Sequence, residues 1–326
     1  MAVPLLVSCL LSATGRRIGG RLPPATAVRL LTAAAVLTAL STGFVLGVAG
    51  FYALAQVPVV ATLGGWSVTS VAMLQSTELV ASGACGAVVL LLLGAATRRL
   101  MLTGGDLARA AVACHRLGRG VDGLIVIDDD QPDAYALPGL TGRVVVSTSM
   151  LRALPANERR VLLAHEAAHL RHHHHLFALL TDLGTAANPL LRPLSGVVRD
   201  AIERWADEDA AAEVADRRLA ARAIARAGLA RARAITPRRL NPAALGAVDT
   251  RVSDRAKALL APHPRPRRML VAAITVLVVA GGAAAATTAA TTEHRFEVAR
   301  QYYQLAPQSP VRGPAINAGE AFHSFK

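Results

Sequence analysis

Long apolar segments interrupt this chain of 326 residues at three places. Residues 30–54 contain no charged side chain, residues 71–96 contain only Glu78 near their start, and residues 269–290 contain none. A helix of roughly 20 apolar residues crosses a hydrocarbon core of about 30 Å. The pattern therefore predicts transmembrane helices at these three segments.

The first 13 residues are also apolar, but they are shorter than a full span. Basic residues follow this segment, whereas a signal peptide carries them in front. The segment could form a short first span. Three spans and four spans place the N-terminus on opposite sides of the membrane, and both arrangements stay open for the N-terminal membrane region of residues 1–97.

The only polar block long enough to fold is residues 98–268. Within it, three short apolar runs separated by turn-rich segments predict a small antiparallel sheet. The runs are residues 124–127, 134–137 and 143–148. A helix is expected at residues 155–183, beginning at a proline and ending before a glycine. The predicted fold is mainly α, a multi-span membrane protein with an α+β domain that combines a small antiparallel sheet with this helix.

Composition and charge agree with a membrane protein. The chain is 53% hydrophobic and 17% charged, with a mean hydropathy of +0.39 and a formal net charge of +13. Arginines border the apolar segments at positions 16, 17, 21, 29, 98, 99, 265, 267 and 268, whereas residues 56–70 contain no Lys or Arg. The positive-inside rule then predicts a multi-pass protein of the plasma membrane whose polar block, residues 98–268, lies in the cytoplasm. Residues 291–326 are expected to form a mostly unstructured tail outside the cell.

The predicted helix at residues 155–183 carries the motif His165-Glu166-Ala167-Ala168-His169. Histidines four residues apart stack on one helix face, so both imidazoles can bind one tetrahedral ion. Glu166 follows the first histidine, where a carboxylate reaches the water bound to such an ion. The spacing favours zinc-assisted hydrolysis, with Zn²⁺ as cofactor.

A catalytic zinc ion needs a third protein ligand, and two candidates are present. Glu203 and Asp207 form a Glu-x-x-x-Asp pair on a later predicted helix, where Glu203 can close the site from another direction. The residue that orients a metal-bound imidazole could be Asp207, although Glu208 and Asp209 are alternatives. The competing interpretation of Glu203 is a surface glutamate paired with a neighbouring arginine.

The second candidate is the histidine run at positions 172–175. His172 and His173 lie three and four residues beyond His169 and share part of its face on a continuous helix. However, His165, His169 and His173 would span about 12 Å of helix axis, too far for bonds of about 2.0–2.1 Å to one ion. The run is better explained as a polar end of the helix.

The arginine-rich stretch at residues 217–239 contains no aromatic side chains. Base stacking in nucleic-acid sites uses such side chains, so a solvated or lipid-facing cationic helix is the better interpretation. No direct nucleic-acid partner is expected.

The chain resembles the BlaR/MecR-type membrane zinc peptidases, which share the HExxH core of the HtpX/Ste24-type membrane peptidases. The resemblance covers roughly residues 121–211 and rests on four segments. These are Asp133-Ala134-Tyr135-Ala136-Leu137-Pro138-Gly139, Val144-Val145-Val146-Ser147-Thr148, the His165 motif, and Glu203 with Asp207.

The resemblance implies that the α+β domain is zincin-like, that His165, His169 and Glu203 are zinc ligands and that Glu166 is the general base. It also implies a substrate-binding edge strand, formed by Ala134, Tyr135, Ala136 and Leu137. Peptidases of this type relieve repression by a winged-helix repressor after an extracellular signal. The segment after the last span contains no Ser-x-x-Lys acylation motif, so we do not expect the penicillin-binding sensor domain of the antibiotic receptors.

The expected function is therefore that of a membrane-bound zinc metalloendopeptidase that cleaves a cytoplasmic repressor or regulatory protein in a signalling pathway. Its partners would be the lipid bilayer and a protein or peptide substrate. Two alternatives remain: a quality-control or processing peptidase for membrane proteins, and a signalling scaffold without turnover. The intact Glu166 argues against the scaffold.

Overall fold

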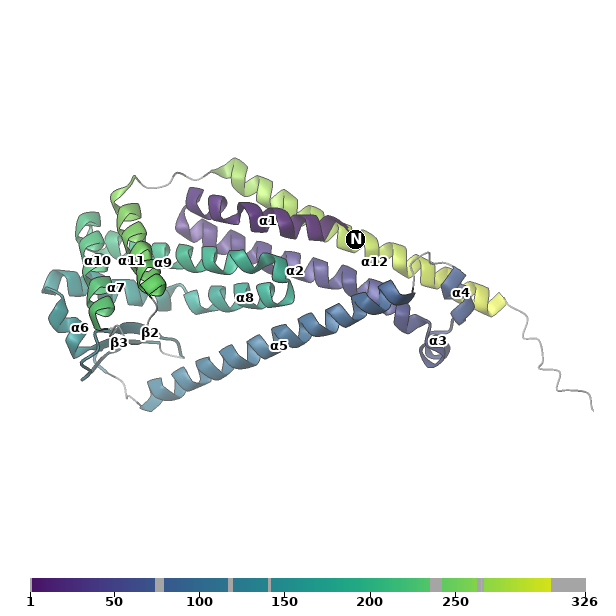
Figure 1. Cartoon of the computed structure of the whole chain (residues 1–326), viewed down its shortest axis with the longest axis horizontal. Helices are drawn as coiled ribbons and strands as arrows, with labels where there is room; N and C mark the ends of the chain where they lie inside the picture. The colour runs from purple at the N-terminus through teal and green to yellow at the C-terminus, as the bar shows by residue number, and fades with distance from the viewer. Residues whose placement is uncertain are drawn as a thin grey trace, which may run out of the picture.

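The computed structural model describes residues 2–73, 79–116, 120–139, 142–234, 242–262, 265 and 267–305. Most of these residues are helical, with one small sheet. Figure 1 shows an elongated molecule, with the sheet and α6, α7, α10 and α11 at one end and α3, α4 and the end of α12 at the other. Long helices connect the two ends.

Three helices of the described part are long and apolar enough to cross a membrane. They are α2 (Pro24–Ala55), α5 (Leu79–Arg116) and α12 (Arg268–Leu305). Where α2 and α5 cross, a Cβ added to Gly50 would lie 2.5 Å from the Cα of Gly86, so only glycine permits this approach. The prediction of a multi-span, mainly helical protein is confirmed.

The helix boundaries differ from the expected ones. The second long helix begins at Leu79 instead of residue 71, and residues 68–73 form a separate short helix, α4 (Val68–Met73), after α3 (Pro58–Gly64). The prediction of an unstructured tail is wrong for residues 291–305, because α12 continues to Leu305. Phe296 explains part of this extension, because its ring packs on Tyr52, near the end of α2, and on Trp66, between α3 and α4. The rest of the tail lies outside the described residues.

The N-terminal segment forms α1 (Ala2–Arg21), which is not among the three candidate spans. One face of α1 is buried, with Val7 and Leu11 3% and 0% exposed. These side chains share a core with α2, α9 and α12. The segment is therefore a packed helix of the bundle, longer than the apolar stretch of 13 residues.

Two helices that follow the metal motif pack into this bundle. The chain runs through α8 (His174–Ala187), a 3-10 turn, η1 (Pro189–Leu191), and α9 (Arg192–Val214). We call the segment 174–198 the inserted hairpin, because α8 and the first turns of α9 lie along α2, next to α1 and α5 (Figure 1). At its tip, Asn188 Nδ2 donates to Ser8 Oγ over 2.8 Å and to Thr42 Oγ1 over 3.2 Å.

A charged cluster holds the middle of the inserted hairpin. The Asp182 carboxylate of α8 accepts hydrogen bonds from Arg199 of α9, over 2.5 Å, and from Arg99 of α5. Ser195 Oγ donates to the same carboxylate over 2.7 Å. Asp182 is only 8% exposed, and a buried carboxylate persists only when it is paired and hydrogen-bonded in this way.

The sheet contains β1 (Leu124–Ile127), β2 (Ala134–Leu137) and β3 (Arg143–Ser147). Its order is β1-β3-β2, with β1 parallel and β2 antiparallel to β3. The expected antiparallel meander is therefore wrong, and the sheet is mixed. The reason is burial: Val145 and Val146 on β3 are 0% exposed, so β3 takes the central position, which is covered on both faces.

The expected helix at residues 155–183 is two helices. α7 (Ala156–Arg171) ends before His172, His173 has a left-handed backbone with φ 51°, and α8 begins at His174. Around α7 lie α6 (Thr148–Ala153), α10 (Arg217–Ala234) and α11 (Pro242–Leu260). Alanine-rich faces of α9 and α10 pack on Val161 and Ala164 and fix the orientation of α7.

Candidate metal centre

His165 and His169 lie one turn apart on α7 and point to the same place. Their Nε2 atoms are 3.2 Å apart. Val161 and Ala168, on the buried side of α7, are 0% exposed, so the helix cannot rotate without losing its packing. Helical periodicity and a fixed buried face together determine the direction of both imidazoles.

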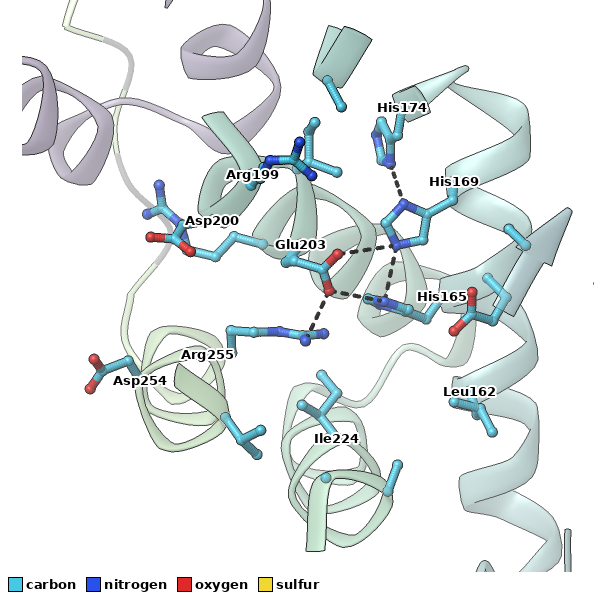
Figure 2. A pocket seen from close by; sticks show the side chains of 18 of the residues that line it. Leu162, His165, His169, His174, Arg199, Asp200, Glu203, Ile224, Asp254 and Arg255 are labelled. Atoms are coloured by element: carbon cyan, nitrogen blue, oxygen red, sulfur yellow. Dashed lines mark hydrogen bonds and ion pairs between the residues drawn. The ribbon is translucent and has the colours of Figure 1, made fainter. Parts of the chain in front are cut away.

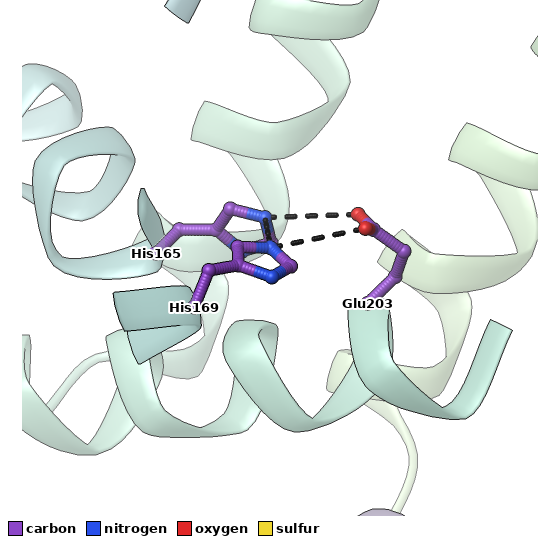
Figure 3. Close-up of side chains that lie close together, drawn as sticks. All are labelled: His165, His169 and Glu203. Carbon is purple, nitrogen blue, oxygen red and sulfur yellow. Dashed lines mark hydrogen bonds and ion pairs between the residues drawn. The ribbon is translucent and has the colours of Figure 1, made fainter. Parts of the chain in front are cut away.

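Glu203 reaches the two histidines from α9. Its Oε2 atom lies 3.7 Å from His165 Nε2, and its Oε1 atom lies 3.7 Å from His169 Nε2 (Figure 3). Ile202, Trp205 and Ala206 of the same helix are buried and hold α9 in place. The Glu203 side chain therefore approaches the two histidines from a separate helix, which is the direction expected from the sequence for a third ligand.

These three residues form the one group in the described part of the chain that could hold a metal ion, with all ligand atoms within 4.8 Å of one another. Ligands bonded to one tetrahedral zinc ion at about 2.0–2.1 Å lie about 3.3 Å apart. The two Nε2 atoms are 3.2 Å apart and each lies 3.7 Å from a different oxygen of Glu203, so the group is near this spacing. Two imidazoles and one carboxylate are also a donor set that zinc prefers, and three protein ligands leave a fourth position open. The residues present therefore fit a catalytic zinc ion.

Asp207 lies behind the first histidine. Its Oδ1 atom is 3.0 Å from His165 Nδ1, and the residue is 1% exposed. The two alternatives named from the sequence lie elsewhere: Glu208 pairs with Arg217, and Asp209 Oδ2 lies 2.5 Å from His172 Nε2. Of these three carboxylates, Asp207 is the one that contacts a histidine of the motif.

Arg255 completes the centre, and it was missed in the sequence. This residue of α11 donates through Nε and Nη2 to Asp207 over 2.8 and 2.6 Å, and its Nη1 lies 2.9 Å from Glu203 Oε2 (Figure 2). It comes 48 positions after Asp207, with no spacing rule that connects the two. Its only local signal is its position on a helix beside the partly buried Val252 and Ala256 and the buried Leu259.

The charges of the centre shift several pKa values. Burial disfavours a charged ring, but Asp207 and Glu203 overcome this effect and raise the pKa of His165 to about 9. Burial also disfavours the charged carboxylates, yet His165 and Arg255 hold the pKa of Glu203 below its usual value, and that of Asp207 likewise. Both carboxylates are therefore ionised and can attract a cation.

His169 and Glu166 shift in the opposite sense. Burial, aided by the positive charge of His165, lowers the pKa of His169 to about 4, so its ring is neutral at pH 7. Burial raises the pKa of Glu166, which is 6% exposed. A carboxylate with a raised pKa is a better proton acceptor, as a general base requires.

A cavity of about 830 Å³ opens beside the three candidate ligands and Glu166. Ala136 and Pro138, at the end of β2, line one side of it, and α10 contributes Ile224 (Figure 2). Gly20 of α1 lines it too. The cavity is large enough for several residues of a peptide, since drug-sized pockets measure roughly 300–1,000 Å³.

The predicted substrate strand, Ala134 to Leu137, is β2 and lies at an edge of the sheet among the described residues. The carbonyl oxygen of Asp133 accepts a hydrogen bond from the Ser147 N–H group. Because backbone groups along a strand alternate in direction, those of Tyr135 also face β3, whereas those of Ala134 and Ala136 face the open edge of the sheet. Arg231 already occupies the carbonyl oxygen of Ala134. Ala136 therefore presents its backbone to the cavity, whereas the 40% exposed Tyr135 side chain is not among the lining residues.

The histidine run does not supply the third position of the cluster. His172 stacks on Trp205 with ring centroids 4.5 Å apart, and His173 is exposed at the helix break. His174 is buried and contacts His169, while His175 lines the cavity. The helix break separates His173 from the face that carries His165 and His169.

Comparison with known proteins gives one match. Residues 97–275 match the family model described as Peptidase family M48. The matched segment contains the sheet, α7, α9 and Arg255, and therefore every residue of the candidate metal centre. Searches of curated proteins and of solved structures returned no match.

Proposed function

The chain belongs to peptidase family M48, and on this premise we propose that it is a membrane-bound, zinc-dependent metalloendopeptidase of the HtpX/Ste24 type. The observation that carries the proposal is the convergence of His165, His169 and Glu203 from two helices beside a peptide-sized cavity. Three helices able to span a membrane support the membrane location.

In the proposed mechanism, His165, His169 and Glu203 would hold the zinc ion. When bound, the ion supplies Lewis-acid activation of a water molecule and of the scissile carbonyl. Glu166 takes a proton from the attacking water and later delivers it to the leaving amine nitrogen. Its buried position beside the ligands suits both steps, because exclusion of water strengthens the charge interactions that drive proton transfer.

The substrate would bind as an extended strand along β2. The backbone of Ala136 faces the cavity and offers the hydrogen bonds that an edge strand leaves open, as in β-strand addition. Since backbone groups are common to all peptides, this contact holds the chain in register without selecting a sequence.

We further propose that the peptidase part faces the cytoplasm and cleaves a repressor or regulatory protein, in analogy with the BlaR/MecR type. Most arginines that flank the candidate spans lie toward the peptidase end of the molecule, whereas Arg295 and Arg300 lie near the opposite end of α12, and this imbalance supports the proposed orientation. The competing function is processing or quality control of membrane proteins. The zinc-dependent hydrolysis of the peptide bond would be the same in both functions.

The deciding experiment compares the full-length protein with its Glu166→Gln and Glu203→Ala variants in detergent. Glu166→Gln should retain stoichiometric zinc and lose turnover by about two to four orders of magnitude. Glu203→Ala should lose both zinc and turnover. Wild-type turnover in Glu166→Gln, or full zinc occupancy in Glu203→Ala, would contradict the proposed roles.

The class of substrate can be determined by comparing the protein N-termini in cells that express the wild-type protein with those in cells that express Glu166→Gln. New N-termini that depend on Glu166 would identify the cleaved proteins. Fragments of a soluble DNA-binding repressor would support the signalling function, and fragments of membrane proteins the processing function. Identical N-termini in both strains would favour a scaffold without turnover.

A further inference from the structure

His174 comes five positions after His169, and the chain between them is not one helix. On a continuous α-helix, side chains three and four positions apart share a face, whereas those five apart do not. Here α7 ends and His173 turns with φ 51° and ψ 44° before α8 begins at His174. This backbone is unusual for a residue other than glycine, and it brings His174 back against His169.

The two rings meet at their Nδ1 atoms, which are 3.0 Å apart (Figure 2). The ring centroids lie 4.8 Å apart and the ring planes are nearly perpendicular, at 85°. His174 is 2% exposed, and its ring packs on Trp205 at 4.8 Å. The His174 ring therefore has a fixed position beside the candidate ligand.

The direction of this hydrogen bond follows from the geometry at the other nitrogen of His169. His169 Nε2 faces His165 Nε2 at 3.2 Å and Glu203 at 3.7 Å, so it is the atom directed at the metal position. A neutral imidazole that offers Nε2 as a ligand carries its proton on Nδ1. His169 Nδ1 is then the donor and His174 Nδ1 the acceptor.

His174 must consequently carry its own proton on Nε2. That atom is buried and has no hydrogen-bond partner among the residues that the structure describes. A buried donor without a partner destabilises a fold. A polar side chain at this position is therefore explained by its other nitrogen, which is the one that contacts His169.

We propose that His174 is a positioning residue for the metal centre, whose Nδ1 accepts the Nδ1 proton of His169 and thereby fixes the tautomer and ring orientation that present Nε2 to the ion. This inference rests on the proposed function, because it takes His169 as a ligand. Asp207 has the same relation to His165, at 3.0 Å. Each imidazole of the pair thus has a polar group beside its Nδ1 atom, a carboxylate for His165 and a neutral imidazole for His169.

The test uses full-length protein in detergent and measures the zinc dissociation constant by chelator competition. Three variants separate shape from hydrogen bonding. His174→Asn places its amide oxygen near the position of Nδ1 and keeps the acceptor, His174→Gln places its polar atoms near Nε2, and His174→Phe keeps a ring without an acceptor. His173→Asn is the control, because this neighbouring side chain is exposed and asparagine tolerates the same left-handed backbone.

His174→Phe and His174→Gln should bind zinc about 10- to 100-fold more weakly than wild type, as found for other residues that orient a metal ligand. His174→Asn should stay within a few-fold of wild type, and His173→Asn should be unchanged. The visible absorption spectrum of the Co²⁺-substituted protein should change in the Phe and Gln variants and not in the Asn variant.

Equal zinc affinity and equal Co²⁺ spectra in wild type, Asn and Gln variants would overturn the inference while leaving the zinc site intact. If the Phe variant does not fold, the Asn and Gln variants still decide, since they differ mainly in where the polar atoms lie. Absence of zinc binding in wild type would instead refute the proposed function on which the inference rests.

Discussion

The Nδ1 atom of His165 lies 3.0 Å from Oδ1 of Asp207, and the same carboxylate is held by Arg255. An arginine, a carboxylate and an imidazole thus form a chain that leads to the candidate metal position. Glu203 joins this chain, because Arg255 also contacts its Oε2 atom over 2.9 Å. The electrostatic support of the centre therefore comes from α11, a helix that carries none of the candidate ligands.

Asp207→Asn should weaken zinc binding by about tenfold or more, because an amide can accept the His165 proton but carries no charge to raise the basicity of the ring. The measurement is chelator competition on the full-length protein. Asp209→Asn is the matched control, since Asp209 pairs with His172 and Arg171 away from the cluster. An equal effect of both substitutions would mean that Asp207 has no specific relation to the metal.

Arg255→Met should destabilise the zinc-free protein by about 3 kcal/mol, because it leaves the buried Asp207 carboxylate without its cation. Zinc should recover part of the loss, since ligand binding to the folded state shifts unfolding. Thermal unfolding with and without zinc measures both effects. Lys257→Met on the same helix is exposed and should change neither. A loss no larger than that of this control would show that Arg255 is dispensable.

Zinc affinity should depend on pH through His165. With its pKa raised from 6.5 to about 9, the empty site holds a proton at neutral pH that zinc must displace. The apparent dissociation constant should therefore fall about tenfold per pH unit from about pH 7 to about pH 9 and then level off. Proton binding itself stabilises the empty form, fully below about pH 6.5 and no longer above about pH 9.

Isothermal titration in buffers of different ionisation enthalpy counts the protons that zinc binding releases. About one proton per zinc is expected near pH 7.5. Asp207→Asn lowers the pKa of His165 and should move the plateau to lower pH. Affinity that does not change between about pH 7 and about pH 9 would contradict the protonated state of the empty site.

Ala136→Pro should raise KM for peptide substrates by an order of magnitude or more, because it removes the N–H group that faces the open edge of β2. Zinc content should not change. Tyr135→Pro is the informative comparison, because the Tyr135 backbone faces β3 and its loss breaks the sheet itself. The first variant should fold with normal stability and the second should not. A normal KM in Ala136→Pro would exclude substrate binding along this edge.

Local patterns in the sequence account for much of this structure. The spacing of His165 and His169 needs only helical periodicity, and Glu203 and Asp207 follow the same rule on α9. The long helices follow from apolar runs. Each of these features depends on residues close together in sequence, so a pattern can predict it.

Other features depend on packing between distant segments. The helix break at His172 and His173 contains no glycine or proline from which it could be predicted. It is stabilised by contacts of His174 with His169 and Trp205. The contact of Arg255 with Asp207 joins two helices across 48 positions. The parallel pairing of β1 and β3 likewise depends on which strand is covered on both faces. These features required the structure.

The inserted hairpin has a practical consequence for anyone who wishes to isolate the enzyme in water. The helix with both histidines and the helix with Glu203 are joined through it, and its side chains Leu191, Leu194 and Val198 are 0% exposed against α1 and α2. Expression of residues 98–268 alone would expose this apolar surface to water. It would also remove α1 and α2, on which the inserted hairpin packs and which thereby help to fix the distance between α7 and α9. We therefore expect that the peptidase part folds correctly only when it is expressed together with its membrane helices.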